Sequence, residues 1–180
     1  GFHGLATALV ARALASAHSR PLRCVTATFE QSQQLTADLR FLWGEDAREF
    51  EDTAQGQVLY LGASEASPYA EVNPDRRAAH SRLATLFHLA HGLPFRFVVT
   101  SAAALLRKVV PREVVEQHAE LVVEEQELDR DALVAKLSES GYLRVPLVED
   151  PGSFAVRGAI LDVWPPGSVS PTRIELLGDL

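Results

Sequence analysis

Hydrophobic residues in the first half of the chain fall either at helical spacing or in short unbroken runs. Leu5, Leu9 and Ala13, and likewise Val10 and Leu14, recur at helical spacing, which predicts an amphipathic helix. A second series of leucines later in the chain also predicts an amphipathic helix. The residues expected on the buried side of that later helix are Leu83, Leu86 and Leu89. Helices are predicted over residues 4–18, 30–43, 74–90 and 102–109.

The unbroken apolar runs between these helices predict buried strands. Cys24-Val25-Thr26-Ala27-Thr28 is typical, because β-branched residues fit a pleated, half-buried surface. Strands that alternate with helices form parallel βαβ units. Residues 1–112 are therefore expected to form an α/β domain around a parallel sheet. Its predicted strands are residues 24–28, 57–61 and 95–100.

The pattern changes near Pro111, and most of the chain beyond that residue has the pattern of strands. An acidic, valine-containing stretch from Glu120 to Glu127 is a strand candidate, and one helix follows it up to about Ser140. Residues 113–180 are therefore expected to form a second, smaller α+β domain. Its other predicted strands are 142–148, 153–164 and 171–177, the last two joined by the turn residues Pro165-Pro166-Gly167-Ser168.

Four residues have the chemistry that starts or ends helices. Ser101 and Asp129 are predicted N-caps, because their side-chain oxygens can accept hydrogen bonds from the first free N–H groups. Gly44 and Gly141 stand where a left-handed C-cap belongs, a conformation that glycine adopts without a Cβ clash. These caps locate the ends of the predicted helices more accurately than hydrophobic spacing does.

Composition excludes several classes of function. No apolar run approaches the ~20 residues needed to cross a bilayer, and Cys24 is the single cysteine, so no internal disulfide can form. We expect a buried Cys24 thiol and a cytoplasmic protein without membrane contact. The net charge of −7 argues against nonspecific binding of nucleic acid, which requires clustered cations.

The first eight residues, Gly1-Phe2-His3-Gly4-Leu5-Ala6-Thr7-Ala8, stand where a phosphate-binding loop would open a helix. A Walker A loop reads G-x-x-x-x-G-K-[ST], with a lysine for the β/γ-phosphates and a hydroxyl for Mg²⁺. Here Ala6 replaces the second glycine, Thr7 the lysine and Ala8 the hydroxyl residue. No lysine precedes Lys108, so we expect no functional phosphate loop, no nucleotide cofactor and no coupled ATP hydrolysis. The alternative, given equal weight, is that the glycines at the start of the chain are not the remains of a phosphate loop.

Other groups of residues with candidate chemistry do not complete a metal site or a catalytic site. His88 and His91 lie three residues apart on a predicted helix, but no cysteine or acidic residue at matched spacing completes a metal site. No G-x-S-x-G elbow supplies a nucleophilic serine. The sequence thus predicts no metal and no catalytic residue. The acidic cluster of Glu120, Glu124, Glu125 and Glu127 is interpreted as a solvated strand edge.

From residue 67 onward the chain resembles bacterial transcription-repair coupling factors. Ser67-Pro68-Tyr69 and the later Ser81-Arg82-Leu83-Ala84-Thr85-Leu86 resemble that family's "LPYD…SRLATL" region. The longer stretch Pro151-Gly152-Ser153-Phe154-Ala155-Val156-Arg157-Gly158-Ala159-Ile160-Leu161-Asp162-Val163 resembles "EPGEFAVRGGILDIF". Pro165-Pro166-Gly167-Ser168 and Arg173-Ile174-Glu175 continue the match, whereas the first 66 residues agree only in the order of elements.

The resemblance implies a fold and a function. The family's N-terminal module is similar to the excision-repair subunit UvrB: a degenerate RecA/P-loop-like domain into which a smaller UvrB-like domain that contacts UvrA is inserted. By this resemblance, residues 113–180 are the UvrA-docking domain and the chain is a non-catalytic fragment that recruits UvrA in transcription-coupled excision repair. RNA polymerase and DNA would be bound only through other parts of the full-length protein.

The resemblance also implies site residues. UvrA contact in the family is carried by two arginines and a phenylalanine, which correspond to Arg157, Arg173 and Leu177. Leu177 departs from the family because it offers an apolar contact without an aromatic ring. On a strand Arg173, Glu175 and Leu177 share one face, and Ile174 points to the other. The alternative is that Arg157 and Arg173 are ordinary solvated arginines.

Two other functions remain open on the sequence alone. The chain could be a fragment of a UvrB-type helicase that binds nucleotide and DNA, or a purely structural module that covers the motor of the full-length protein. The missing G-K-[ST] loop argues against the first, and UvrA binding would distinguish docking from the second.

Overall fold

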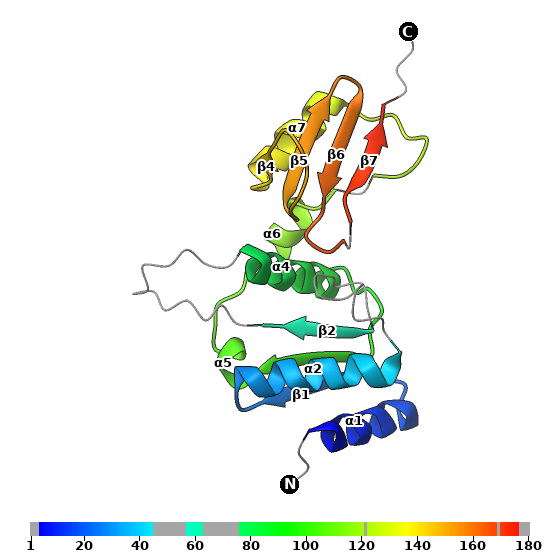
Figure 1. Ribbon diagram of the computed structural model, residues 1–180, viewed down its shortest axis with the longest axis vertical. Coiled ribbons are helices and arrows are strands. Elements are labelled where there is room, and N and C mark those ends of the chain that lie inside the picture. Colours follow the sequence, from blue (N-terminus) through cyan, green and yellow to red (C-terminus); the bar gives the residue numbers. More distant parts are fainter. Residues whose placement is uncertain (1–3, 45–56, 63–75, 121, 169, 177–180) are drawn as a thin grey trace.

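The computed structural model describes residues 4–44, 57–62, 76–120, 122–168 and 170–176. Figure 1 shows two parts stacked along the long axis of the molecule. We call them the parallel-sheet part, which runs from helix α1 to helix α5, and the mixed-sheet part, which runs from helix α6 to strand β7. Among the described residues, no helix is long and apolar enough to span a membrane.

The parallel-sheet part contains a three-stranded sheet in the order β1-β3-β2. Both strand pairs are parallel, with Cys24 of β1 opposite Val99 of β3 and Leu59 of β2 opposite Val98. The predicted parallel βαβ arrangement is therefore confirmed. The elements are α1 (Leu5–Ala17), β1 (Leu22–Thr26), α2 (Phe29–Trp43), β2 (Val58–Leu61), α4 (Arg76–Ala90), β3 (Phe97–Ser101) and α5 (Ala102–Leu105).

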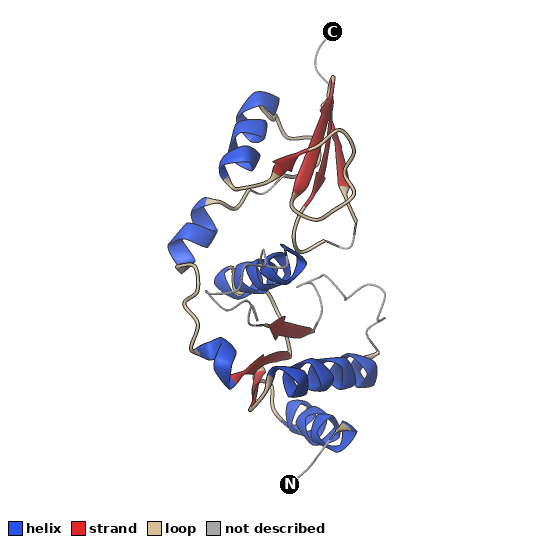
Figure 2. Cartoon of the chain, turned by 60° about the vertical axis from the view of Figure 1, so that its left-hand side comes forward, coloured by secondary structure: helices blue, strands red, loops and turns tan. Residues whose placement is uncertain are grey.

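Helices cover the two faces of this sheet (Figure 2). Helix α2 lies against one face, where Leu35 and Leu39 meet Val58 and Phe97, and α1 packs on the same cluster. Helix α4 covers the opposite face through Ala84. Trp43 at the end of α2 meets Phe97 edge-on, with ring centroids 5.3 Å apart.

The buried residues of helices α1 and α4 follow only in part from hydrophobic spacing. Ala8, Ala11 and Ala15 of α1 are buried, whereas Leu5, Leu9 and Leu14 are exposed. Helix α1 is apolar on nearly every side, so spacing alone does not select its inner face, and the small alanines allow close approach to α2. On α4, Leu89 packs on the core as predicted and Leu86 is half-buried, whereas Leu83 is exposed. The fully buried residues of this helix are Ala84, Thr85, His88 and Ala90.

The mixed-sheet part has a four-stranded sheet in the order β4-β5-β6-β7. Strands β4 and β5 are parallel, and the other two pairs are antiparallel. Helix α7 packs on one face, where Leu133 joins Phe154, Leu161 and Val163 in a second core. The elements are α6 (Arg112–Gln117), α7 (Arg130–Glu139), β4 (Leu143–Arg144), β5 (Ser153–Arg157), β6 (Ile160–Trp164) and β7 (Thr172–Glu175).

All four predicted helix caps are confirmed. The Ser101 hydroxyl accepts a hydrogen bond from the Ala104 N–H at 3.3 Å. The Asp129 carboxylate accepts bonds from the Asp131 and Ala132 N–H groups at 2.9 and 3.0 Å. Gly44 and Gly141 have φ angles of 75° and 86°, in the left-handed region expected after a helix.

Several predicted strands and one helix were too long. The stretch 153–164 is a hairpin rather than one strand, because Gly158 adopts φ 60° and turns the chain between β5 and β6. The strand predicted over 142–148 is limited to Leu143–Arg144, and a bond from the Val145 N–H to the Phe154 carbonyl oxygen at 2.9 Å follows directly after it. The helix predicted over 102–109 ends at Leu105, ahead of the helix-disfavouring Pro111. Helix α6 was not predicted.

The acidic strand candidate was wrong in the part that the structure describes, residues 120 and 122–127. These residues form no strand, and Glu125 adopts φ 61° in a turn. The Val123 N–H donates to the side-chain oxygen of Gln126 at 3.0 Å, so a local bond takes the place of a strand ladder. Clustered carboxylates that repel each other also disfavour strand pairing here.

The two parts meet at α4. A Cβ built on Gly152 would overlap Cε1 of His80 and lie 2.7 Å from its Nε2, so Gly152 lies in direct contact with that imidazole. Gly167 similarly approaches Ala84, where a Cβ would lie 3.4 Å away. Helix α6 also contacts α4. The mixed-sheet part is thus seated on α4 through loops that precede and follow its central hairpin.

The prediction of a buried thiol is met in part. Cys24 is half-buried on β1, beside the core that α2 covers. Burial raises the pKa of this thiol, which disfavours the nucleophilic thiolate.

Candidate protein-docking surface

Strand register places the two predicted docking arginines on one face of the mixed sheet. Arg157 ends β5 opposite Ile160, and Arg173 on β7 lies opposite Asp162 on β6. Directly opposed residues share a face, and alternate residues along a strand do too. Arg157, Asp162 and Arg173 therefore lie on the same face, together with Glu175. The other face carries the core residues Phe154, Leu161, Val163 and Ile174, which lie toward α7.

Arg173 is held by a bidentate ion pair across β6 and β7. Its Nε donates to Oδ1 of Asp162 at 2.7 Å, and its Nη2 donates to Oδ2 at 3.0 Å. The two side chains differ in exposure, with 55% of Arg173 and 14% of Asp162 accessible to solvent. The arginine is thus accessible while its carboxylate partner is largely covered.

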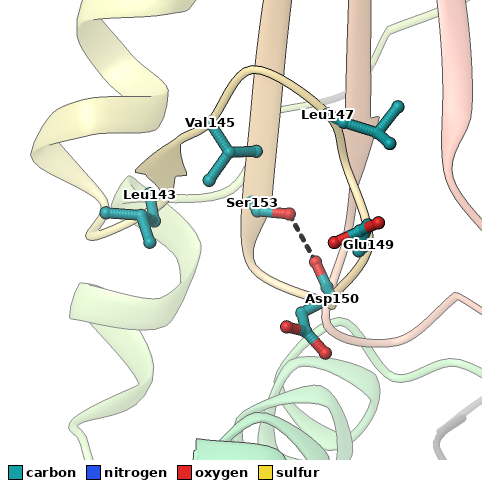
Figure 3. Close-up of a pocket in the computed structure, with 6 residues that line it drawn as sticks. All are labelled: Leu143, Val145, Leu147, Glu149, Asp150 and Ser153. Carbon is teal, nitrogen blue, oxygen red and sulfur yellow. Dashed lines mark hydrogen bonds between the residues drawn. The ribbon is translucent and has the colours of Figure 1, made fainter.

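Arg157 is held by a loop instead of a carboxylate. Its Nη2 donates to the carbonyl oxygen of Pro146 at 2.7 Å. The same loop is tied to β5 where the Ser153 hydroxyl donates to the carbonyl oxygen of Asp150 at 2.5 Å, as Figure 3 shows. The loop over residues 145–150 therefore lies against β5, and Arg157 holds this loop at Pro146.

A shallow hollow lies beneath this loop (Figure 3). Apolar side chains and two carboxylates line it, and Leu147 is 57% exposed. The hydroxyl among its lining residues, that of Ser153, donates to the Asp150 carbonyl oxygen. The lining residues are Leu143, Val145, Leu147, Glu149, Asp150 and Ser153.

The ion pair changes the acidity of Asp162. The hydrogen bond from Arg173 lowers the pKa of this carboxyl most, partial burial raises it, and the positive charges of Arg173 and Arg157 lower it further. A carboxyl with a lowered pKa in the folded state stabilises the fold above its unfolded pKa, and loses that contribution as the pH falls through the folded value.

This linkage gives a pH prediction. The contribution of the Asp162 carboxylate to the free energy of unfolding is fully present above the usual aspartate pKa of 3.8. It is lost below that pH, because protonation removes the charge that Arg173 binds. We expect the thermal midpoints of the wild type and Asp162→Asn to differ at pH 7 and to converge as the pH is lowered toward 3. Circular dichroism melts at several pH values measure this, and a constant difference over the whole range would contradict it.

The degenerate phosphate-loop positions lie around the start of α1. Gly4 precedes the helix with φ 59°, and Ala6 and Thr7 lie in its first turn. Ala8 is fully buried against the core and has no contact with solvent. The Thr7 N–H donates to the Gly4 carbonyl oxygen at 3.0 Å. Gly1 and the docking candidate Leu177 lie outside the described residues.

The two histidines considered for metal binding each bond to a carbonyl oxygen. A ring nitrogen of His88 lies 3.0 Å from the Pro94 oxygen, and one of His91 lies 3.0 Å from the Phe87 oxygen. No group of three metal-ligating side chains occurs in the part of the chain that the structure describes.

Asp162 and Pro146, which accept hydrogen bonds from Arg173 and Arg157, were not predicted from the sequence. Their roles depend on which strand lies beside which, and the stretch 153–164 was predicted as one strand without a turn. The available signal was Gly158 directly after Arg157, since a glycine inside a strand pattern often marks a turn or bulge. A hairpin centred there places Ala155 opposite Asp162, as observed.

Comparison with known proteins identifies the second part. Residues 121–180 match the family described as "UvrB interaction domain". The chain is 42% identical over 179 residues to the transcription-repair-coupling factor of Myxococcus xanthus, covering 99% of the chain and 15% of that protein. It is 28% identical over 176 residues to the one of Escherichia coli, covering 98% and 14%. It is 31% identical over 158 residues to UvrABC system protein B of Thermus thermophilus, covering 81% and 22%.

The mixed sheet is backed by α7 on one face and carries Arg157, Asp162, Arg173 and Glu175 on the other, which we call the open face. By its family match this part is an interaction domain of the UvrB class. Similarity over almost the whole chain goes further: the chain belongs to the transcription-repair-coupling factor family. It spans about 15% of the length of the M. xanthus relative, so that protein's other activities are not assigned to it.

Proposed function

We propose that this chain is a non-catalytic docking module that recruits UvrA in transcription-coupled nucleotide excision repair. The observation that carries the proposal is the match of residues 121–180 to an interaction domain that presents Arg157 and Arg173 on its open face. Arginine is the residue best suited to planar, bidentate recognition of carboxylates and is enriched among interface hot spots. Leu177 is proposed as the apolar edge of the same surface.

We further propose a division at residues 112/113 into a degenerate RecA/P-loop-like domain and a UvrB-like insertion. The separate apolar cores around Leu39 and Phe154 support this division. In the first domain the positions of Ala6, Thr7 and Ala8 would be the remains of a phosphate loop that lacks its lysine and hydroxyl. RNA polymerase and DNA would be contacted by other parts of the full-length protein.

Charge reversal on the open face tests the docking function. The 180-residue chain is expected to bind purified UvrA, and Arg173→Glu is expected to weaken binding at least about 30-fold, because a hot-spot cation becomes a repelling anion. Arg157→Glu should act in the same direction. Biolayer interferometry with immobilised UvrA measures the affinities, and circular dichroism melts check the fold.

Arg112→Glu is the matched control. Arg112 also pairs with a carboxylate, Glu116 at 2.7 Å, and is exposed, but it lies on α6 away from the sheet face. The same change in net charge there should leave UvrA affinity within about twofold. Equal binding by Arg173→Glu, Arg157→Glu and Arg112→Glu would refute the residue assignment, and turnover of ATP by the chain would refute the non-catalytic role.

A further inference from the structure

The open face of the mixed sheet carries charges of alternating sign. Asp162 and Arg173 lie in one cross-strand row, and Arg157 and Glu175 lie in the next row on either side of Ile160. We call the four charged residues of these two adjacent rows the charge strip. The positive charge of Arg157 acts on Asp162, and the negative charge of Glu175 acts on Arg173. Two cations and two anions sum to no net formal charge. A broadly acidic partner surface is therefore not attracted to this face simply by its charge.

Asp162 differs from the rest of the strip in being covered. It is 14% exposed and lies on β6, with β5 on one side and β7 on the other. The residue opposite it on β5, Ala155, is fully buried. Both oxygens of this largely covered carboxylate accept from the same guanidinium, so Asp162 anchors Arg173 in one position.

The ion pair leaves part of Arg173 available. A guanidinium has five N–H donors in one plane, and Asp162 accepts one from Nε and one from Nη2. The remaining three belong to Nη1 and to the outer side of Nη2. Because the guanidinium is planar and rigid, binding one edge to Asp162 fixes the direction of the others.

We propose that Asp162 is a positioning residue of the UvrA-docking surface: it holds Arg173 so that its free N–H donors meet a carboxylate in a partner strip of alternating charge. This inference rests on the proposed docking function. A long arginine side chain loses rotamer freedom on binding, and fixing it beforehand reduces that loss. Alternating charges also fix the register of two surfaces, because a shifted partner would face like charges.

The experiment is Asp162→Asn in the 180-residue chain, with UvrA affinity measured by biolayer interferometry. Asparagine keeps the size of the side chain and one oxygen but gives up the charge. We expect binding to weaken about tenfold, because the bidentate pair is lost and Arg173 becomes mobile. If net charge alone governed docking, the extra positive charge of this variant would leave affinity unchanged or increase it.

Two further variants separate positioning from folding. In an Arg173→Ala background, Asp162→Asn is expected to change affinity less than twofold, whereas a purely structural role would give the same loss in both backgrounds. Arg173→Lys keeps the charge and can still pair with Asp162, so the fold is retained, but it lacks the planar fork. We expect Arg173→Lys to lose at least tenfold in affinity.

Asp131→Asn is the matched control, since Asp131 also pairs with an arginine, Arg130 at 2.8 Å, but lies on α7. It should bind UvrA like the wild type. The positioning role is refuted if Asp162→Asn binds as tightly as Asp131→Asn, or if Arg173→Lys binds as the wild type, while Arg173→Glu abolishes binding. Failure of the wild type to bind UvrA would instead refute the proposed function.

Discussion

Replacing Phe154 by alanine is expected to cost the mixed-sheet part about 3–5 kcal/mol of its free energy of unfolding. The ring is fully buried on β5 and contacts the cluster formed by Leu133, Leu161 and Val163. Truncation removes the buried area of the ring and leaves a cavity that the surrounding strands fill only partly. A core of this size has few other large side chains to compensate, so we expect this part to unfold at much lower urea concentrations.

Two tryptophans allow each part to be followed separately. Trp164 lies on β6 and donates its Nε1–H to the Ser168 carbonyl oxygen at 2.9 Å, whereas Trp43 packs on Phe97 in the other part. Urea unfolding followed by fluorescence in Trp43→Phe and Trp164→Phe backgrounds gives one transition for each part. Phe154→Ala should shift the Trp164 transition strongly and the Trp43 transition little.

Phe41→Ala is the control for the same chemical change. Phe41 lies on α2 with 76% of its surface exposed, so its truncation should alter stability by less than about 0.5 kcal/mol. Equal effects of Phe154→Ala and Phe41→Ala on the Trp164 transition would contradict the core described for the mixed-sheet part.

The features that could be predicted from the sequence are those fixed by local chemistry. Ser101, Asp129, Gly44 and Gly141 cap helices as expected, because a cap depends on one side chain or one φ angle next to it in the chain. The parallel pairing of the first sheet also follows from local order, since helices between strands require crossover connections. Both predictions need no knowledge of distant contacts.

The buried faces and strand limits were harder because they depend on packing. Helix α1 has leucines and alanines around its circumference, and its contact with α2 selected the alanines Ala8, Ala11 and Ala15. In the stretch 153–164 the apolar pattern continues on both sides of Gly158, so a hairpin and a single strand have the same hydrophobic signature. The φ angle of this glycine decided between them.

The residues of the proposed docking surface could be predicted only within single strands. Alternation along β7 correctly separated Arg173 from Ile174, which joins the core. The proximity of Arg157 and Arg173, and the ion pair with Asp162, depend on the order β5-β6-β7 and on its register. Neither can be obtained from spacing within a single segment.

Gly152→Ala is expected to destabilise the mixed-sheet part by about 2–4 kcal/mol, for two independent reasons. Gly152 has φ 75°, a conformation that costs a residue with a Cβ about 1–2 kcal/mol. The added methyl group would also overlap the His80 ring, at 2.7 Å from Nε2, so the imidazole must rotate or shift to admit it. Two backbone hydrogen bonds hold Gly152 in place. Its N–H donates to the Trp164 carbonyl oxygen at 2.7 Å, and its carbonyl oxygen accepts from the Leu143 N–H at 2.9 Å.

Matched variants separate the two costs. Gly158 has φ 60° with no atom within 4 Å of a built Cβ, so Gly158→Ala measures the conformational cost alone. Gly152→Ala should exceed it by the cost of the His80 contact, and this excess should disappear in a His80→Ala background. Equal destabilisation by Gly152→Ala and Gly158→Ala, measured by Trp164 fluorescence in urea, would contradict the close contact. The excess therefore measures the steric cost of a methyl group between the loop before β5 and helix α4, at the point where the two parts of the chain meet.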